Sequence, residues 1–146
     1  MVTDNKNLYR LLDANLNRCR EGLRVIEDIS RFILNDKDTS SEIKNIRHSI
    51  SDYIISIDKN KLNNELLQSR DSDADVGKAI NLQTEMNRDD LSAIVRANFI
   101  RAEESLRVLE EFTKLFDGDI SAKVKALRYS CYSLEKNIID KLNKEI

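Results

Sequence analysis

The chain has no proline, only three glycines and a single histidine among its 146 residues. Strand-rich folds need turn residues at each strand end, and so few glycines without proline cannot supply them. This scarcity excludes all-β folds and dinucleotide-binding α/β folds. Apolar runs are only a few residues long, so the sequence lacks both a membrane span and the apolar segment of a signal peptide. We therefore expect a soluble, cytoplasmic protein.

An excess of charge of one sign is also missing. Lys and Arg number 24 against 26 Asp and Glu, for a formal net charge of −2. Nucleic-acid and anionic-membrane partners usually call for a basic domain or stripe, so we expect neither. The cysteines, Cys19 and Cys131, have no metal-ligand spacing, and His48 alone cannot complete a zinc site with them. We expect two buried thiols, a surface histidine and no nucleophilic triad.

What the sequence does contain is apolar residues at helical spacing. The spacing predicts a first long helix over residues 4–34. A capping box formed by Thr39 and Glu42 predicts the start of a second helix, with an apolar stripe that continues to Ile57. These two helices would form one hairpin.

A second hairpin is predicted in the other half of the chain. Its first helix would be capped by Asn87 and run to Phe116, with Gly118 as a left-handed C-terminal cap, and its second helix would cover about 124–138. Residues 58–86 are the only long irregular stretch. The predicted fold is a single all-α domain, a four-helix bundle of two hairpins joined by a long central crossover.

The two hairpins are copies of one another. A shift of 83 residues lays 14–28 over 97–111 with eight of fifteen positions identical, where roughly one is expected by chance. A shift of 81 residues pairs Lys44, Arg47 and Ser49 with Lys125, Arg128 and Ser130. The repeats therefore span about 4–58 and 87–143.

Five of the eight identities are Asn, Arg or Glu, although an amphipathic helix needs only its apolar positions to be kept. On a wheel of about 100° per residue, duplicated polar residues fall on the core side. They are Asn15, Arg18, Arg47, Asn98, Arg101 and Arg128. We expect Asn15, Arg18, Asn98 and Arg101 to be mostly buried around one polar cavity.

A buried arginine must find a carboxylate or a ligand anion. One interpretation is a structural ion-pair network with the flanking glutamates Glu21, Glu27, Glu104 and Glu110. The other is an anion site, because the planar guanidinium group matches phosphate. Only the second interpretation accounts for the duplicated asparagine. Arg24 and Arg107 fall on the opposite helix face, where they would support the site or a subunit interface, so a homodimer is possible.

The crossover carries an acidic loop with two interpretations. Asp71, Asp73 and Asp75 alternate like the start of an EF-hand, but Gly77 comes one place late and Leu82 stands where a bidentate Glu is needed. An EF-hand is excluded. The loop is either a solvated acidic turn or a magnesium and nucleotide loop. Gly-rich phosphate-binding motifs are absent, so side chains would have to bind any phosphate.

The paired blocks at 14–27 and 97–110, with Arg70-Asp71-x-x-x-Asp75-Val76-Gly77 between them, resemble the small helical hydroxymethylpyrimidine phosphate kinase domain. That domain is typically fused in front of thiamin phosphate synthase and also occurs alone. The resemblance covers essentially the whole chain. It implies a stand-alone kinase of thiamin biosynthesis, with magnesium-ATP as donor and hydroxymethylpyrimidine phosphate as acceptor. A non-catalytic partner of the synthase and a purely structural bundle are the alternatives.

From these arguments Asp71 and Asp75 are expected to be the catalytic and magnesium-binding carboxylates, with Gly77 giving the loop a conformation that a Cβ would hinder. The expected phosphate- and substrate-binding residues are Asn15, Arg18, Glu21, Arg47, Arg70, Gly77, Asn98, Arg101, Glu104 and Arg128. Because the copies differ where Gly22 replaces Ser105, and at two further polar positions, we expect one ligand set per chain.

Overall fold

The computed structural model describes residues 5–58, 64–79 and 87–145, and within them the chain is all-helical without a strand. The predicted fold class is confirmed. The elements are α1 (Asn5–Asp28), the π-helical turn η1 (Ile29–Ile33), α2 (Lys37–Ile55), α3 (Asn64–Gln68), α5 (Leu91–Thr113) and α6 (Gly118–Glu145).

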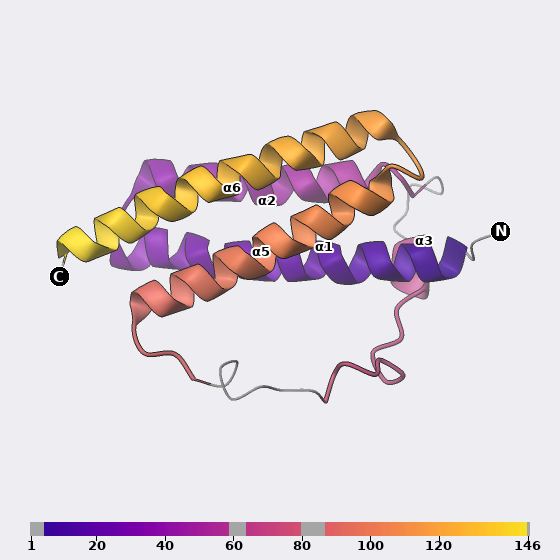
Figure 1. Ribbon diagram of the computed structural model, residues 1–146, viewed down its shortest axis with the longest axis horizontal. Coiled ribbons are helices and arrows are strands. Elements are labelled where there is room, and N and C mark those ends of the chain that lie inside the picture. Colours follow the sequence, from indigo (N-terminus) through magenta and orange to yellow (C-terminus); the bar gives the residue numbers. More distant parts are fainter. Residues whose placement is uncertain (1–4, 59–63, 80–86, 146) are drawn as a thin grey trace.

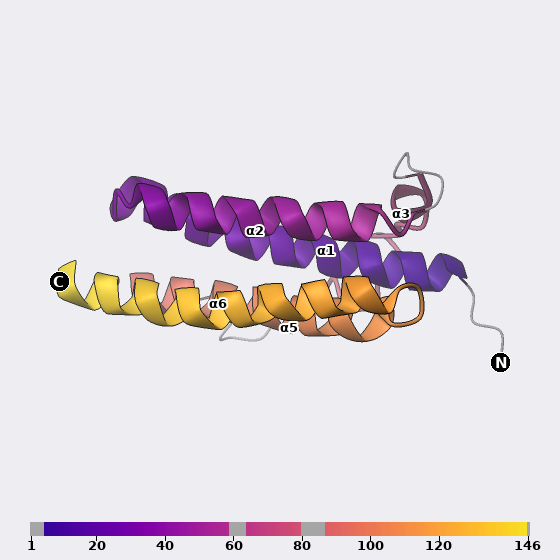
Figure 2. The same cartoon turned by 90° about the horizontal axis from the view of Figure 1, so that it is seen from above.

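The four long helices form a bundle of two hairpins (Figure 1). Helices α1 and α2 make one hairpin and α5 and α6 the other, and Figure 2 shows them as two layers with the hairpin turns at opposite ends. Helix α1 packs on α2 and α5, while α6 packs on α5 and α2. Both repeats therefore contribute to one shared core.

Apolar side chains at helical spacing fill that core, with Leu23 and Phe99 among those fully buried. Both cysteines are free and buried, as predicted, and burial raises the pKa of the Cys19 thiol to about 12. Inert buried thiols are the usual state of such residues. His48 is exposed, as predicted.

Two helices begin differently from the prediction. Asp36, not Thr39, caps α2, because its Oδ1 accepts the backbone N–H of Thr39 at 3.1 Å. Asp90, not Asn87, caps α5, by accepting the N–H of Ala93 at 2.8 Å. In both cases an aspartate takes the role, three residues before the predicted cap in α2 and three residues after it in α5, since a carboxylate both caps and complements the helix dipole.

The second hairpin turn also differs, since α5 ends at Thr113 and Gly118 begins α6. No described glycine has a positive φ, so the predicted left-handed cap is wrong. The N–H groups of Phe116 and Asp117 donate to the Thr113 carbonyl oxygen at 2.9 and 2.8 Å, and these bonds close the turn without a left-handed residue. The first turn instead contains Asn35, with φ 52°.

Gly22 allows α1 to approach α5 closely. A Cβ at this position would lie 2.9 Å from the carbonyl oxygen of Asn98 and 3.7 Å from the backbone N of Ala102. The oxygen belongs to helix backbone and cannot rotate away. Any larger residue must push the two helices apart.

Gly22→Ala is expected to lower the free energy of unfolding by about 2 kcal/mol, because overpacking exceeds the ~1 kcal/mol gain in helix propensity. Urea unfolding measures the difference. Gly118→Ala is the matched control, since nothing lies within 4 Å of its added Cβ. An equal response of the two variants would contradict the close-packing argument.

Glu103 lies buried between the two helices of the second hairpin, and its Oε2 has no hydrogen-bond partner among the described residues. Burial, followed by the neighbouring Glu135 carboxyl, raises its pKa to about 8. Glu104 adds negative charge, and the Cys131 thiol also lies within electrostatic range. Between about pH 4.5 and about pH 8, the folded chain therefore keeps a proton on Glu103 that the unfolded chain releases.

The free energy of unfolding is expected to fall as the pH rises from about 4.5 to about 8, because the folded-state pKa is raised above its ordinary value. Glu103→Gln should flatten this dependence and gain about 1–3 kcal/mol over the wild type near pH 8. Urea unfolding across the pH range tests it, with the exposed Glu42→Gln as control. An unchanged slope in Glu103→Gln would show that another group titrates.

Candidate functional site

A cavity of about 980 Å³, here called the interhelical cavity, opens between α1 and α5. Helix α1 contributes Asn15 and Arg18. The segment before α5 contributes Asn87, Arg88 and Asp89, and α5 contributes Ala93, Ala97, Ile100, Arg101, Glu104, Ser105 and Val108. Its size is that of a small-molecule site, and its lining mixes apolar, cationic and acceptor groups.

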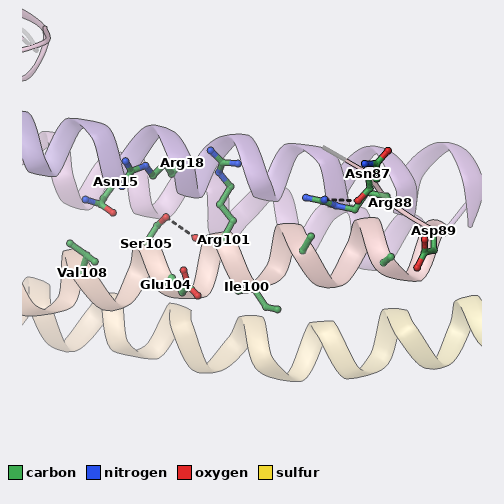
Figure 3. A pocket seen from close by; sticks show the side chains of 12 residues that line it. Asn15, Arg18, Asn87, Arg88, Asp89, Ile100, Arg101, Glu104, Ser105 and Val108 are labelled. Atoms are coloured by element: carbon green, nitrogen blue, oxygen red, sulfur yellow. Dashed lines mark hydrogen bonds between the residues drawn. The ribbon is translucent and has the colours of Figure 1, made fainter. Parts of the chain in front are cut away.

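Arg18 and Arg101 occupy corresponding positions in the two repeats and face this one cavity. Figure 3 shows Arg101 reaching from α5 toward α1, where Arg18 lies. In the described part of the chain neither guanidinium group forms an ion pair or a hydrogen bond. Asp89 and Glu104 also line the cavity, but the two arginines pair with neither, and such unpaired guanidinium groups favour an anionic ligand.

The predicted burial is correct for Asn15, which is 6% exposed, and wrong for Arg18 and Arg101, which are exposed. Arg18 falls at the edge of the apolar arc of α1. From such a position a long side chain buries its stem and extends its charged group into water. The arginines therefore border an open cavity and do not enter the core.

The duplicated asparagines make the same local contact but take different places. Each donates from Nδ2 to the carbonyl oxygen four residues earlier, at 2.9 Å for Asn15 and 2.8 Å for Asn98. Asn15 lines the cavity together with Ser105, whereas Asn98 is not among the lining residues and its backbone is in close contact with Gly22. At Gly22 the two helices are therefore in close contact beside Asn98, whereas at the corresponding Ser105 they leave room for the cavity beside Asn15.

The duplicated arginines of α2 and α6 are engaged by buried glutamates. Arg47 Nε lies 3.0 Å from Glu27 Oε1, and Arg128 Nη2 lies 3.1 Å from Glu110 Oε1. These pairs correspond in the two repeats. The ion-pair interpretation is confirmed for them, and neither Arg47 nor Arg128 lines the interhelical cavity.

The remaining predicted members of the network divide as follows. Arg24 and Arg107 are half-exposed and add a second bond to the same two glutamates, at 3.3 and 3.0 Å. Glu21 is exposed, and Glu104 lines the cavity. Neither Glu21 nor Glu104 has an ion pair within the described residues, so their predicted pairing with arginine is not found.

A smaller hollow of about 130 Å³, the loop hollow, lies where the acidic loop meets α1. Arg70 binds Asp13 through two bonds of 2.8 Å, and Arg10 donates to the carbonyl oxygen of Asp71 at 3.1 Å. Its lining residues are Arg10, Asp13, Ala14, Asn17, Arg70, Asp71, Ser72 and Asp75. Asp13 and Arg10 were not predicted, and the repeat gives no signal for Asp13 because its counterpart is Arg96.

Asp71 and Asp75 both line the loop hollow, as a shared role requires. Each carboxylate uses one oxygen locally, Asp71 for the N–H of Ala74 and Asp75 for the N–H of Gly77. Gly77 lacks a positive φ, and its added Cβ would meet only Asp75 Oδ1 at 3.4 Å, so the expectation that a Cβ would hinder it is wrong.

The two cavities share α1, since Asn15 and Arg18 line one while the adjacent residues Ala14 and Asn17 line the other.

In the parts of the chain described here, no group of three or more His, Cys, Asp or Glu side chains could hold a metal ion. No described helix is long and apolar enough to cross a membrane.

Comparison with known proteins places the chain in a family. The model of the ThiD2 family matches residues 10–137. The chain is 42% identical over 135 residues to the thiamine-phosphate synthase of Thermosynechococcus vestitus, covering 92% of this chain and 36% of that protein. It is 39% identical over 132 residues to that of Nostoc punctiforme, covering 90% and 35%.

The thiamine-phosphate synthase of Rhodopirellula baltica is 37% identical over 131 residues, which cover 89% of this chain and 34% of that protein. The chain thus spans about a third of the length of these curated relatives. No solved structure matches it. The family match covers most of the chain, including most of both repeats and the acidic loop between them, and the chain therefore belongs to the ThiD2 family.

Proposed function

We propose that the chain is a phosphotransferase of thiamin biosynthesis that uses ATP to phosphorylate hydroxymethylpyrimidine phosphate to the diphosphate. Membership of the ThiD2 family and similarity to proteins named thiamine-phosphate synthase support a place in this pathway. The observation that carries the kinase hypothesis is the pair of uncompensated arginines, Arg18 and Arg101, at one cavity of substrate size.

The proposed reaction suits a site with arginines and without histidine. The attacking oxygen belongs to a phosphate monoester that is already ionised near neutral pH, so no general base is needed. Positioning of the phosphoryl groups and neutralisation of their charge dominate such catalysis. Arg18 and Arg101 would bind phosphoryl oxygens, while Ile100 and Val108 offer apolar contacts to the pyrimidine ring.

Asp71 and Asp75 fit a magnesium ion that also takes phosphate oxygens and water, because such ions need only one or two protein carboxylates. Each retains an oxygen that is not used by the local turn. When bound, the ion would neutralise phosphoryl charge. The Arg70–Asp13 pair would hold the loop against α1, the helix that also contributes to the interhelical cavity.

Asp75→Ala is expected to lower turnover by roughly two orders of magnitude at saturating magnesium, since loss of a metal ligand removes several kcal/mol of charge stabilisation. Steady-state kinetics measures the effect. Asp73→Ala is the control, because Asp73 is fully exposed and does not line the loop hollow. Near-normal turnover of Asp75→Ala would rule out the metal role.

The direct experiment is a phosphotransfer assay with magnesium-ATP and hydroxymethylpyrimidine phosphate, scored by formation of the diphosphate and ADP. Calorimetry with ATP, ADP and the pyrimidine phosphate gives the binding of each ligand. Turnover supports the kinase, and the absence of any binding leaves only a structural bundle.

A second candidate is a non-catalytic module that binds the pyrimidine phosphate and acts with thiamin phosphate synthase. One observation favours it: the chain matches about a third of the length of each relative that is named a thiamine-phosphate synthase. This candidate requires binding of the pyrimidine phosphate without ATP turnover, together with co-purification with the synthase.

A further inference from the structure

A separate hollow of about 410 Å³, the first-turn hollow, lies at the turn between η1 and α2. It shares no lining residue with the interhelical cavity or the loop hollow. Its lining residues are Glu27, Arg31, Asn35, Lys37, Ser40, Ser41 and Lys44. Three cationic side chains and two hydroxyl groups therefore face one small space.

The single carboxylate of this hollow is already compensated, because Glu27 accepts from Arg47 at 3.0 Å and from Arg24 at 3.3 Å. Arg31, Lys37 and Lys44 form no ion pair within the described residues. Asp36, the nearby cap of α2, is engaged by Lys141 and Thr39. The hollow thus holds like charges that repel one another until an anion neutralises them.

The second hairpin provides an internal comparison, since a hollow of about 450 Å³, the second-turn hollow, lies at the corresponding place. Basic residues recur there, with Lys114 as the counterpart of Arg31 and Lys125 as that of Lys44. All four are exposed, so packing does not require them. In the second copy, however, Lys114 is paired with Glu111 at 3.1 Å.

The π-helical turn η1 explains why the first copy lacks the corresponding pair. Asp28 is the counterpart of Glu111, three residues before Arg31, and such a spacing forms an ion pair on a regular helix. Here the chain widens after Asp28, and the N–H of Leu34 donates to Ile29 five residues earlier at 3.0 Å. Asp28 instead lies 3.8 Å from Arg24 Nε, while Arg31 lines the hollow with its guanidinium group 4.8 Å from the centre of the Phe32 ring. Single π turns are frequent at functional sites.

We propose that the first-turn hollow is a second anion site, distinct from the interhelical cavity, which takes inorganic phosphate or a small phosphate monoester. Arg31 supplies planar donors, Lys37 and Lys44 supply point charges, and Ser40 and Ser41 supply hydroxyl donors. A dianion neutralises two of the three positive charges, which a chloride ion cannot do. The second-turn hollow binds the same anion more weakly because its cations are largely paired.

The test is calorimetry of the full chain with inorganic phosphate at constant ionic strength. All proteins carry Arg18→Met and Arg101→Met, so that the interhelical cavity lacks its two proposed phosphate ligands and failure of the kinase hypothesis does not affect the result. Adding Arg31→Met and Lys44→Met should weaken phosphate binding about tenfold or more. Adding Lys114→Met and Lys125→Met is the matched control and should change it little.

A parallel titration with glycerol phosphate shows whether an ester is accepted, and circular dichroism confirms that each variant is folded. Binding of either phosphate compound that depends on Arg31 and Lys44 supports the site. Equal weakening by the two variant pairs, or no binding of either compound beyond that of chloride, would overturn it.

Discussion

Replacing Arg128 by methionine is expected to lower the free energy of unfolding by about 3 kcal/mol, because it leaves the buried carboxylate of Glu110 with only the half-exposed Arg107 as a partner. Methionine retains the packing of the arginine stem, so the loss reports the charge. The repeat predicts the same result for Arg47→Met, which leaves Glu27 with only its longer bond to the half-exposed Arg24. Urea unfolding at neutral pH measures both.

The double variant Arg128→Met/Glu110→Met shows whether the stability loss comes from the weakly paired charge of Glu110 or from lost packing. Removal of both partners should recover most of the stability, since a buried ion pair replaced by apolar groups is often neutral or stabilising. A double-mutant cycle gives the coupling between the two side chains. If Arg128→Met alone is as stable as the wild type, the pair does not contribute to the core.

Arg18→Met and Arg101→Met are expected to weaken ligand binding without lowering stability, in contrast to Arg128→Met. Each should weaken binding of the pyrimidine phosphate by roughly 10- to 150-fold, equivalent to the ~1.5–3 kcal/mol of a charge-assisted hydrogen bond. Each should leave the free energy of unfolding within about 0.5 kcal/mol of the wild type, because both side chains are exposed and unpaired in the described structure.

Calorimetry, kcat/KM and urea unfolding of the same preparations check this contrast. Lys136→Met is the control, since Lys136 is exposed on α6 and does not line the cavity. The wild type should also gain melting temperature on addition of the phosphate ligand, and the two arginine variants should gain less. A large loss of stability in Arg18→Met or Arg101→Met, without any ligand-induced shift in the wild type, would favour the structural bundle.

The two pairs of arginines show where inference from the sequence stops. Arg18 and Arg47 are both duplicated, and both fall among apolar residues on a helical wheel. The wheel describes one helix at a time. It does not contain the distance to a glutamate on another helix, and that distance assigns Arg47 to an ion pair and Arg18 to a cavity.

Asp13 illustrates a different limit. It is absent from the second repeat and lies outside the apolar stripe, so neither duplication nor periodicity indicates a role. Only the folded chain brings Arg70 to it across 57 residues of sequence. The contact depends on the path of the crossover, which local residue patterns do not encode.

By itself the sequence determined the helical class, the two hairpins, the buried thiols and the asymmetry expected from Gly22, because helical periodicity and close packing act over a few residues. Only the tertiary structure decided which helix ends are capped by which aspartate, which arginines find carboxylates and which remain uncompensated. Those outcomes depend on distances between helices that pack against one another, and electrostatic pairing and desolvation change steeply with such distances.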